Sequence, residues 1–197
     1  MSETVYLKKT AFLIPFLVDS ILLTFFFVLV ACAHNARPDI TNQFPDKAFL
    51  ITGVPFFPQK DQFCGPASLQ SVFAYWGRPF SQEEISKEIF IPQLKGTLNF
   101  DLVNFATAQG FRAETPAGNL KELEERIRQK HPVIAFLNLG NNLFPLGHYI
   151  VIIGYDLSKR EIIFHSGQNE FERMPYSTFL NQWKSTDDWM LVVLPGV

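Results

Sequence analysis

Two residues in the sequence carry the side chains that thiol-dependent acyl transfer requires. Cys64 stands in the run Gln-Phe-Cys-Gly-Pro-Ala-Ser, and His148 opens the run His-Tyr-Ile-Val-Ile-Ile. A thiolate is a strong nucleophile, and an imidazole can remove the thiol proton and later protonate a leaving group. If the fold brings these two side chains together, they form the pair that a catalytic cysteine needs.

The residues that follow Cys64 predict an α-helix that begins at the cysteine. Pro66 suits the first helical turn, where its missing N–H would be unpaired anyway. The unpaired N–H groups and the positive end of the helix dipole favour thiolate over thiol at this position. The alternative is that Cys64 is only a small buried apolar residue, as many free cysteines are. The apolar face of the helix has the spacing i, i+3, i+4 and i+7, at Leu69, Val72, Phe73 and Trp76.

Residues 59–67, together with the run Gly-His-Tyr around His148, resemble a known enzyme family. The family is that of the papain-like bacteriocin-processing (double-glycine leader) peptidases, the thirty-ninth cysteine peptidase family, and the resemblance covers about residues 50–195. It implies an α+β, papain-like fold in which an N-terminal helix carrying the cysteine packs on an antiparallel sheet carrying the histidine. It also implies that Cys64 is the nucleophile, that His148 transfers protons, and that Gln59 helps to form the oxyanion hole.

The sequence departs from the family at the acid that orients the imidazole. The family has an aspartate about one strand after the histidine, whereas this sequence has His165 and Ser166 there. Ser166 could hold an imidazole N–H without supplying a charge, and His165 is the other candidate. The nearest acid, Asp156, is interpreted more simply as a turn residue.

The resemblance therefore implies a cysteine peptidase whose activity is weakened by a missing carboxylate, because the carboxylate normally stabilises the imidazolium. Two alternatives remain open at this point. One is a catalytically degenerate module of the same fold that binds peptide or cell-envelope partners. The other is an acyl or peptidyl transferase, in which an amine replaces water as the acceptor.

Residues 1–31 predict an export signal. Two lysines at positions 8 and 9 precede an apolar run that extends to residue 31, a pattern typical of secretory signals. The tetrapeptide Leu-Val-Ala-Cys that ends at Cys32 resembles a bacterial lipobox. This resemblance implies a lipid on Cys32 and a membrane-anchored lipoprotein that faces the periplasm or the cell exterior, on the outer membrane if the cell has one.

An uncleaved transmembrane anchor is the alternative for the same run, although Asp19 would be costly inside a bilayer. Residues 32–49 are polar and aperiodic and predict a lipidated N-terminus with a tether, followed by a peptidase-like domain at residues 50–197. With Cys32 lipidated, Cys64 would be a lone thiol in an oxidising compartment, and nucleophilic function would explain its presence there.

Composition excludes several other classes of function. The chain has 17 Lys and Arg against 19 Asp and Glu, and it has no basic stripe that would indicate nucleic-acid binding. No P-loop motif occurs, so we do not expect an ATP-driven transporter. A metal site at Cys64, His148 and His165 has no supporting ligand spacing. We therefore expect no cofactor, a peptide or protein substrate, a membrane contact through the lipid, and a monomer.

The remaining pattern places helices before most of the strands, which favours a segregated α+β arrangement. The loop 138–146 lies beside the predicted site, and its apolar residues could line a substrate cleft or merely anchor the loop. Further helices are expected at 82–90, 99–109, 119–129 and 176–183, and strands at 111–114, 133–137, 149–153, 161–164 and 190–194.

Overall fold

The computed structural model describes residues 47–141 and 143–196. The chain divides into two compact units, and all described residues belong to the unit Phe44–Val197. The predicted signal peptide, the predicted lipidation site at Cys32 and most of the predicted tether lie outside the described residues. Within the described ranges, no helix is long and apolar enough to cross a membrane.

An antiparallel sheet forms the centre of this unit. Its strand order is β2-β7-β3-β4-β5-β6, and β1 pairs with the far end of β4. The long central strand is buried on both faces along most of its length, which explains its continuous apolar run. The strands are β1 (Ala48–Leu50), β2 (Phe111–Glu114), β3 (Val133–Asn138), β4 (Gly147–Asp156), β5 (Glu161–Ser166), β6 (Asn169–Pro175) and β7 (Met190–Pro195).

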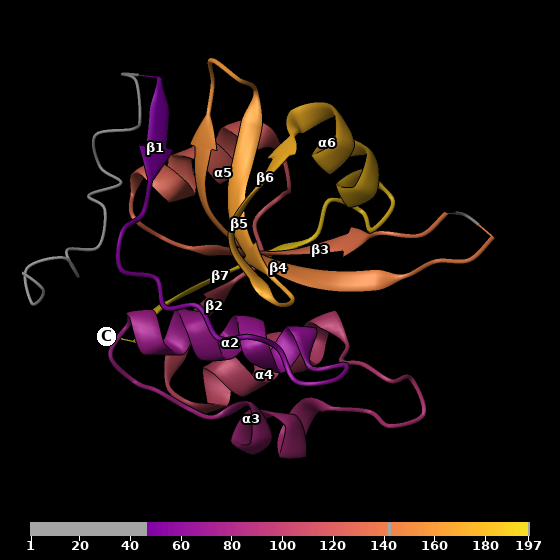
Figure 1. Ribbon diagram of the computed structural model, residues 1–197. Helices are drawn as coiled ribbons and strands as arrows, with labels where there is room; N and C mark the ends of the chain where they lie inside the picture. Colours follow the sequence, from indigo (N-terminus) through magenta and orange to yellow (C-terminus); the bar gives the residue numbers. More distant parts are fainter. Residues whose placement is uncertain (1–46, 142, 197) are drawn as a thin grey trace, which may run out of the picture. The chain divides into compact units, whose positions relative to one another are not determined.

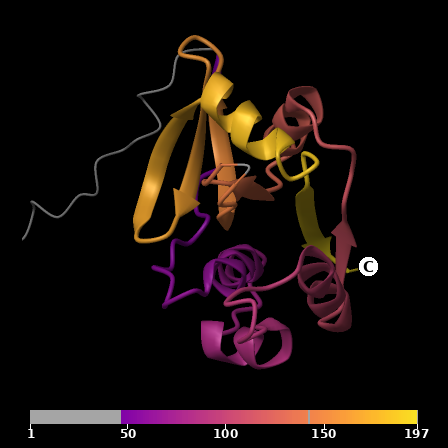
Figure 2. The ribbon, with the colours of Figure 1, turned by 90° about the vertical axis from the view of Figure 1, so that its right-hand side faces the viewer.

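The helices form two groups on either side of the sheet. Figure 1 shows α2 (Cys64–Tyr75), α3 (Gln82–Ile89) and α4 (Asn99–Ala108) together below the strands. The other two helices, α5 (Leu120–Arg128) and α6 (Tyr176–Lys184), lie above. In Figure 2 the axis of α2 points toward the viewer beneath the strands, so this helix lies between the sheet and α3.

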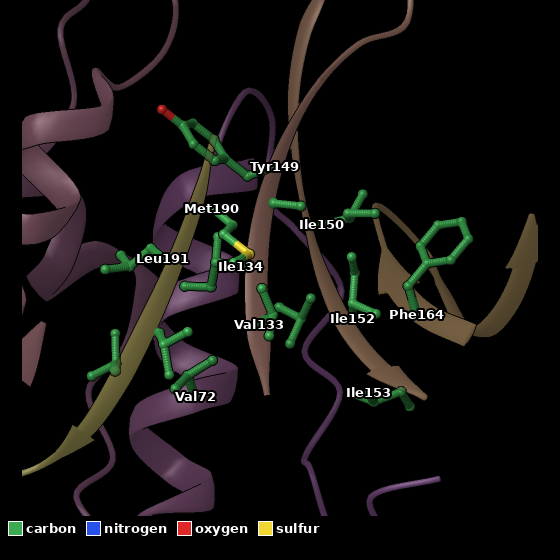
Figure 3. Packing of buried hydrophobic residues seen from close by; sticks show 14 of the residues in the cluster. Val72, Val133, Ile134, Tyr149, Ile150, Ile152, Ile153, Phe164, Met190 and Leu191 are labelled. Atoms are coloured by element: carbon green, nitrogen blue, oxygen red, sulfur yellow. The ribbon is translucent and has the colours of Figure 1, made fainter. Parts of the chain in front are cut away.

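The apolar face of α2 is the main contact between the helical group and the sheet. Leu69, Val72 and Phe73 are completely buried. Figure 3 shows Val72 of α2 among the buried side chains of the core, and α2 packs against β4. Full burial of each such side chain contributes about 1.5–3 kcal/mol, so these contacts fix the position of the first residue of α2, Cys64.

The structure confirms the α+β fold that the sequence predicts, with every expected helix and strand present. A capping box begins α3, because Ser81 and Glu84 bond each other's backbone N–H. Two short strands were not predicted. β1 starts at Ala48, before the domain boundary expected at residue 50. β6 alternates charged and apolar residues too weakly to give a strand signal, and most of its side chains are exposed.

Candidate active site

Cys64 lies at the first position of α2, where its sulfur receives backbone N–H donors. These donors belong to Tyr149 on β4, to Gly65 and to Cys64 itself. Burial raises the pKa of the Cys64 thiol, and the three N–H groups only partly oppose this effect. The predicted helix terminus is present, but the predicted preference for thiolate is wrong, because desolvation outweighs the helix N–H groups.

His148 is the second residue of β4, and its ring bonds to the neighbouring strand. Its Nε2 lies 2.8 Å from Oγ of Ser166. Burial lowers the pKa of His148, whereas the carboxylate of Glu172 on β6 raises it. Because the thiol pKa is raised and the imidazole pKa is lowered, both groups are neutral in the resting site near pH 7.

The structure places Cys64 against the strand that carries His148, with no hydrogen bond between the two side chains. The sulfur instead accepts the N–H of Tyr149, the residue that directly follows His148. The Nδ1 atom of His148 forms no hydrogen bond with the described residues. The imidazole therefore has one nitrogen bonded to Ser166 and one nitrogen available for a proton.

Ser166, and not His165, contacts the histidine because successive strand residues point to opposite faces of a sheet. His165 pairs with Val151 in the register of β4 and β5. Its Nδ1 accepts the N–H of Phe171 at 3.2 Å, and its Nε2 lies 3.3 Å from the carbonyl oxygen of Val54. These contacts make His165 a buried structural residue.

Gln59 shares a small cavity with the cysteine. The cavity has a volume of about 20 Å³, which is room for about one water molecule. The amide oxygen of Gln59 is buried and has no hydrogen-bond partner among the described residues. A buried amide oxygen without a hydrogen-bond partner is unusual, because leaving a buried polar group unpaired costs about 1–3 kcal/mol. The other residues that line the cavity include Phe56, Phe57, Ala67, Ser68, Tyr149 and Ser166.

The backbone on both sides of Gln59 is held by the buried side chain of Gln82. Gln82 Oε1 accepts the N–H of Lys60 at 2.9 Å, and Gln82 Nε2 donates to the carbonyl oxygen of Pro58 at 3.0 Å. The N–H of Gln59 itself donates to the carbonyl oxygen of Gly167 at 2.9 Å. The segment before α2 is thus fixed relative to the end of β5.

Tyr149 is a site residue to which sequence reasoning gave no role. Its ring packs on Phe136, with 4.5 Å between the ring centroids, and its hydroxyl donates to Oδ1 of Asn99 at 2.7 Å. Burial raises the pKa of Tyr149, so the phenol remains neutral. Tyr149 directly follows His148 in the motif, so its position in the sequence could have indicated it. Asn99 begins a helix 50 positions away in the sequence and gave no such signal.

The structure places Asp156 far from the site, at the other end of β4. Its Oδ1 accepts the N–H groups of Ser158 and Lys159, both at 3.0 Å, so the interpretation as a turn residue is confirmed. Among residues 47–141 and 143–196, no cluster of three or more His, Cys, Asp or Glu could hold a metal ion.

Comparison with known proteins gives one family match and several matching folds. The model of the Peptidase_C39 like family matches residues 51–189. A search of curated proteins gave no match. The chain is similar to the peptidase domain of Streptococcus ComA, a bi-functional ABC transporter involved in a quorum sensing pathway. The identity is 22% and the TM-score 0.59, over 73% of this chain and 99% of that domain.

Two further solved structures have the same fold. A double glycine motif protease from an AMS/PCAT transporter, solved in complex with the leader peptide, is 19% identical. Its TM-score is 0.58, over 75% of this chain and 98% of that one. Xylellain, a cysteine protease from Xylella fastidiosa, is 14% identical with a TM-score of 0.53, over 82% of this chain and 90% of that one. These matches confirm the papain-like cysteine peptidase fold that the sequence predicts.

Proposed function

The chain belongs to the Peptidase_C39 like family, and on that premise we propose that it is a cysteine peptidase that hydrolyses a peptide bond with Cys64 and His148. The observation that carries the proposal is the position of Cys64 at the start of α2, directly against the backbone of the strand that carries His148. A nucleophile and a base on two rigid elements can keep their geometry through a reaction.

In the proposed reaction, proton transfer accompanies attack, because the resting thiol and imidazole are both neutral. His148 takes the thiol proton as the sulfur adds to the substrate carbonyl carbon and forms the C–S bond. The tetrahedral intermediate collapses, the C–N bond breaks, and the imidazolium gives its proton to the leaving amine. Water then attacks the thioester with His148 as the base, which releases the carboxylic acid and restores the thiol.

Gln59 is the proposed donor to the oxyanion of the intermediate. Its amide has unmet hydrogen-bonding capacity beside Cys64, and rotation of a primary amide exchanges its oxygen and nitrogen positions. The backbone N–H of Cys64 is the second donor. An oxyanion donor of this kind contributes about 10²–10³ in kcat.

A second function has one specific observation in its favour. The neutral thiol and imidazole, with Ser166 in place of a carboxylate, suit a site that binds peptide without cleaving it. The site residues favour hydrolysis, because a binding module has no need of a cysteine and Gln59 on one cavity with His148 on the adjoining strand.

We further propose that the protein is exported and anchored to the membrane by lipid on Cys32, as the sequence predicts. In an oxidising compartment outside the cytoplasm, a cysteine without a disulfide partner needs a function, and catalysis by Cys64 would supply one. The mass of the mature N-terminus tests this proposal: a diacylglyceryl adduct on Cys32 supports it, and an unmodified Cys32 in membrane-extracted protein contradicts it.

The peptidase proposal is tested by incubating the protein with a degenerate fluorogenic peptide library. We expect cleavage by the wild type and none by Cys64→Ala, with the half-buried Ser86→Ala on α3 as the control. Adding an amine acceptor separates hydrolysis from transfer, because a transferase produces a new amide. Cleavage that persists in Cys64→Ala contradicts the proposal, and binding without cleavage supports the second function.

A further inference from the structure

A second cavity is lined by Asn99 and Phe136, two residues that contact Tyr149. Its volume is about 300 Å³, and it lies between the base of the β3–β4 hairpin, the start of α4 and the loop that follows α6. Gly147, which directly precedes His148, is part of its wall. The residues that line it are Asn99, Phe136, Asn138, Pro145, Gly147, Ser185, Thr186 and Asp187.

Asp187 is the only charged residue among those that line the cavity. Its side chain is exposed, and it forms no hydrogen bond or ion pair with the described residues. The neighbouring polar groups are already engaged: Asn99 Oδ1 accepts the hydroxyl of Tyr149, and Asn138 Oδ1 accepts the N–H groups of Gly140 and Leu146. The free negative charge is therefore the main recognition feature of the cavity.

The backbone holds Asp187 in place before any ligand arrives. Asp187 and Asp188 both have left-handed conformations, with φ of 57° and 51°. Their N–H groups donate to the carbonyl oxygens of Lys184 and Trp183 at the end of α6. The carboxylate of Asp187 is thus presented to the cavity by a fixed turn, which reduces the entropy lost when a ligand binds.

Two of the lining residues connect this cavity to the reacting centre. Gly147 directly precedes His148, and Asn99 accepts the hydroxyl of Tyr149. A peptide bound at Cys64 that extends toward Gly147 would bring one of its side chains to this cavity. We propose that Asp187 forms a subsite for a positively charged side chain of the substrate, an amino or guanidinium group close to the scissile bond. A calcium ion is not the expected occupant, because it takes six to eight oxygen ligands, with several carboxylates among them.

The inference rests on the proposed peptidase function and is tested with paired peptides. Each pair carries either lysine or N-acetyllysine at one position, and the pairs together scan all positions around the cleaved bond. Acetylation removes the charge and keeps most of the side chain. We expect wild-type kcat/KM to favour lysine by about two- to fivefold at one position, which is the range for a solvent-exposed ion pair. The ratio is expected to fall toward one at high salt.

Asp187→Asn and Asp188→Asn form a matched pair of variants. Asparagine tolerates the left-handed conformation as aspartate does, and both changes remove one negative charge from the same turn. Only Asp187 lines the cavity. We expect Asp187→Asn to abolish the preference for lysine and Asp188→Asn to keep it.

Three results would overturn the inference: no preference for lysine at any position, a preference that survives Asp187→Asn, or an equal loss in both variants. Failure of the peptidase proposal is recognised separately, because no Cys64-dependent cleavage would then occur with any peptide. In that case the same peptide pairs are compared by equilibrium binding to the wild-type protein. Equal affinity for the lysine and acetyllysine members overturns the subsite, and tighter binding of lysine that Asp187→Asn removes supports it.

Discussion

The Nε2 atom of His148 lies 2.8 Å from the hydroxyl oxygen of Ser166, on the adjacent antiparallel strand. The resemblance to the family implies an aspartate near this position, and this chain has there a neutral hydroxyl that is hydrogen-bonded to the imidazole. The bond fixes the ring and leaves Nδ1 available for the thiol proton. It does not supply the charge that would stabilise an imidazolium.

Replacing Ser166 with alanine is expected to lower kcat by about two- to tenfold, since one hydrogen bond contributes about 0.5–1.5 kcal/mol. KM should change little, because Ser166 acts through His148. Ser166→Thr keeps the hydroxyl and should restore most of the rate, and Ser166→Asp should exceed the wild type. Steady-state kinetics on a cleaved peptide measure all three. An unchanged kcat in Ser166→Ala would contradict an orienting role.

Glu172 on β6, two strands away from β4, is expected to raise the pKa of His148. Its carboxylate raises this pKa, so Glu172→Gln should lower it, and the neutral base should persist to lower pH. The acidic limb of the kcat/KM profile should then move to lower pH. Glu170→Gln is the matched control, because Glu170 acts on His165 instead. A histidine NMR titration that shows the same His148 shift in both variants would refute this assignment.

Alkylation of Cys64 is expected to require more alkaline conditions in the folded protein than in the unfolded chain. Burial raises the thiol pKa above its usual value of about 8.5. The stability gained from the neutral thiol is present below the unfolded pKa and is lost as pH rises through the folded pKa. Iodoacetamide labelling at several pH values, with and without urea and mapped to Cys64 by mass spectrometry, measures the difference. Rapid labelling of the folded protein below pH 7 would mean that the thiolate is favoured after all.

Gln82 is expected to support catalysis through Gln59, since its amide holds the backbone at Pro58 and Lys60. Gln82→Met keeps the size of this buried side chain and removes both bonds, so we expect a loss of about tenfold in kcat, within the coupling range for contacting residues. In a Gln59→Ala background the same change should have almost no further effect. The exposed Gln129→Met is the control. Equal losses in both backgrounds would indicate a general loss of stability.

The local pattern of the sequence was enough to predict the helix at Cys64 and the strand at His148. Apolar spacing defined one face of α2, and the β-branched run defined β4. The sequence left open whether Ser166 or His165 meets the histidine. The answer depends on strand register, because Val151 pairs with His165 and so turns Ser166 toward the face of His148.

Features that depend on the packing of distant segments could not be predicted. The thiol of Cys64 is neutral because the sheet and the segment 56–59 bury it, and local sequence shows only the helix terminus that favours thiolate. Gln82 lies within a capping-box pattern, which gave no reason to assign it the support of Gln59. The pairing of Asn99 with Tyr149 joins residues 50 positions apart.

The most direct test of the central claim is to trap an acyl group on Cys64 with an activated ester such as a p-nitrophenyl ester. This measurement requires no knowledge of the natural substrate, and peptide mapping separates Cys64 from Cys32. We predict a thioester on Cys64 in the wild type at pH 7, a loss of about 10²–10⁴ in its rate of formation in His148→Ala, and a smaller loss in Ser166→Ala. Acylation of Cys64 at the same rate in wild type and His148→Ala would show that the two residues do not act as nucleophile and base.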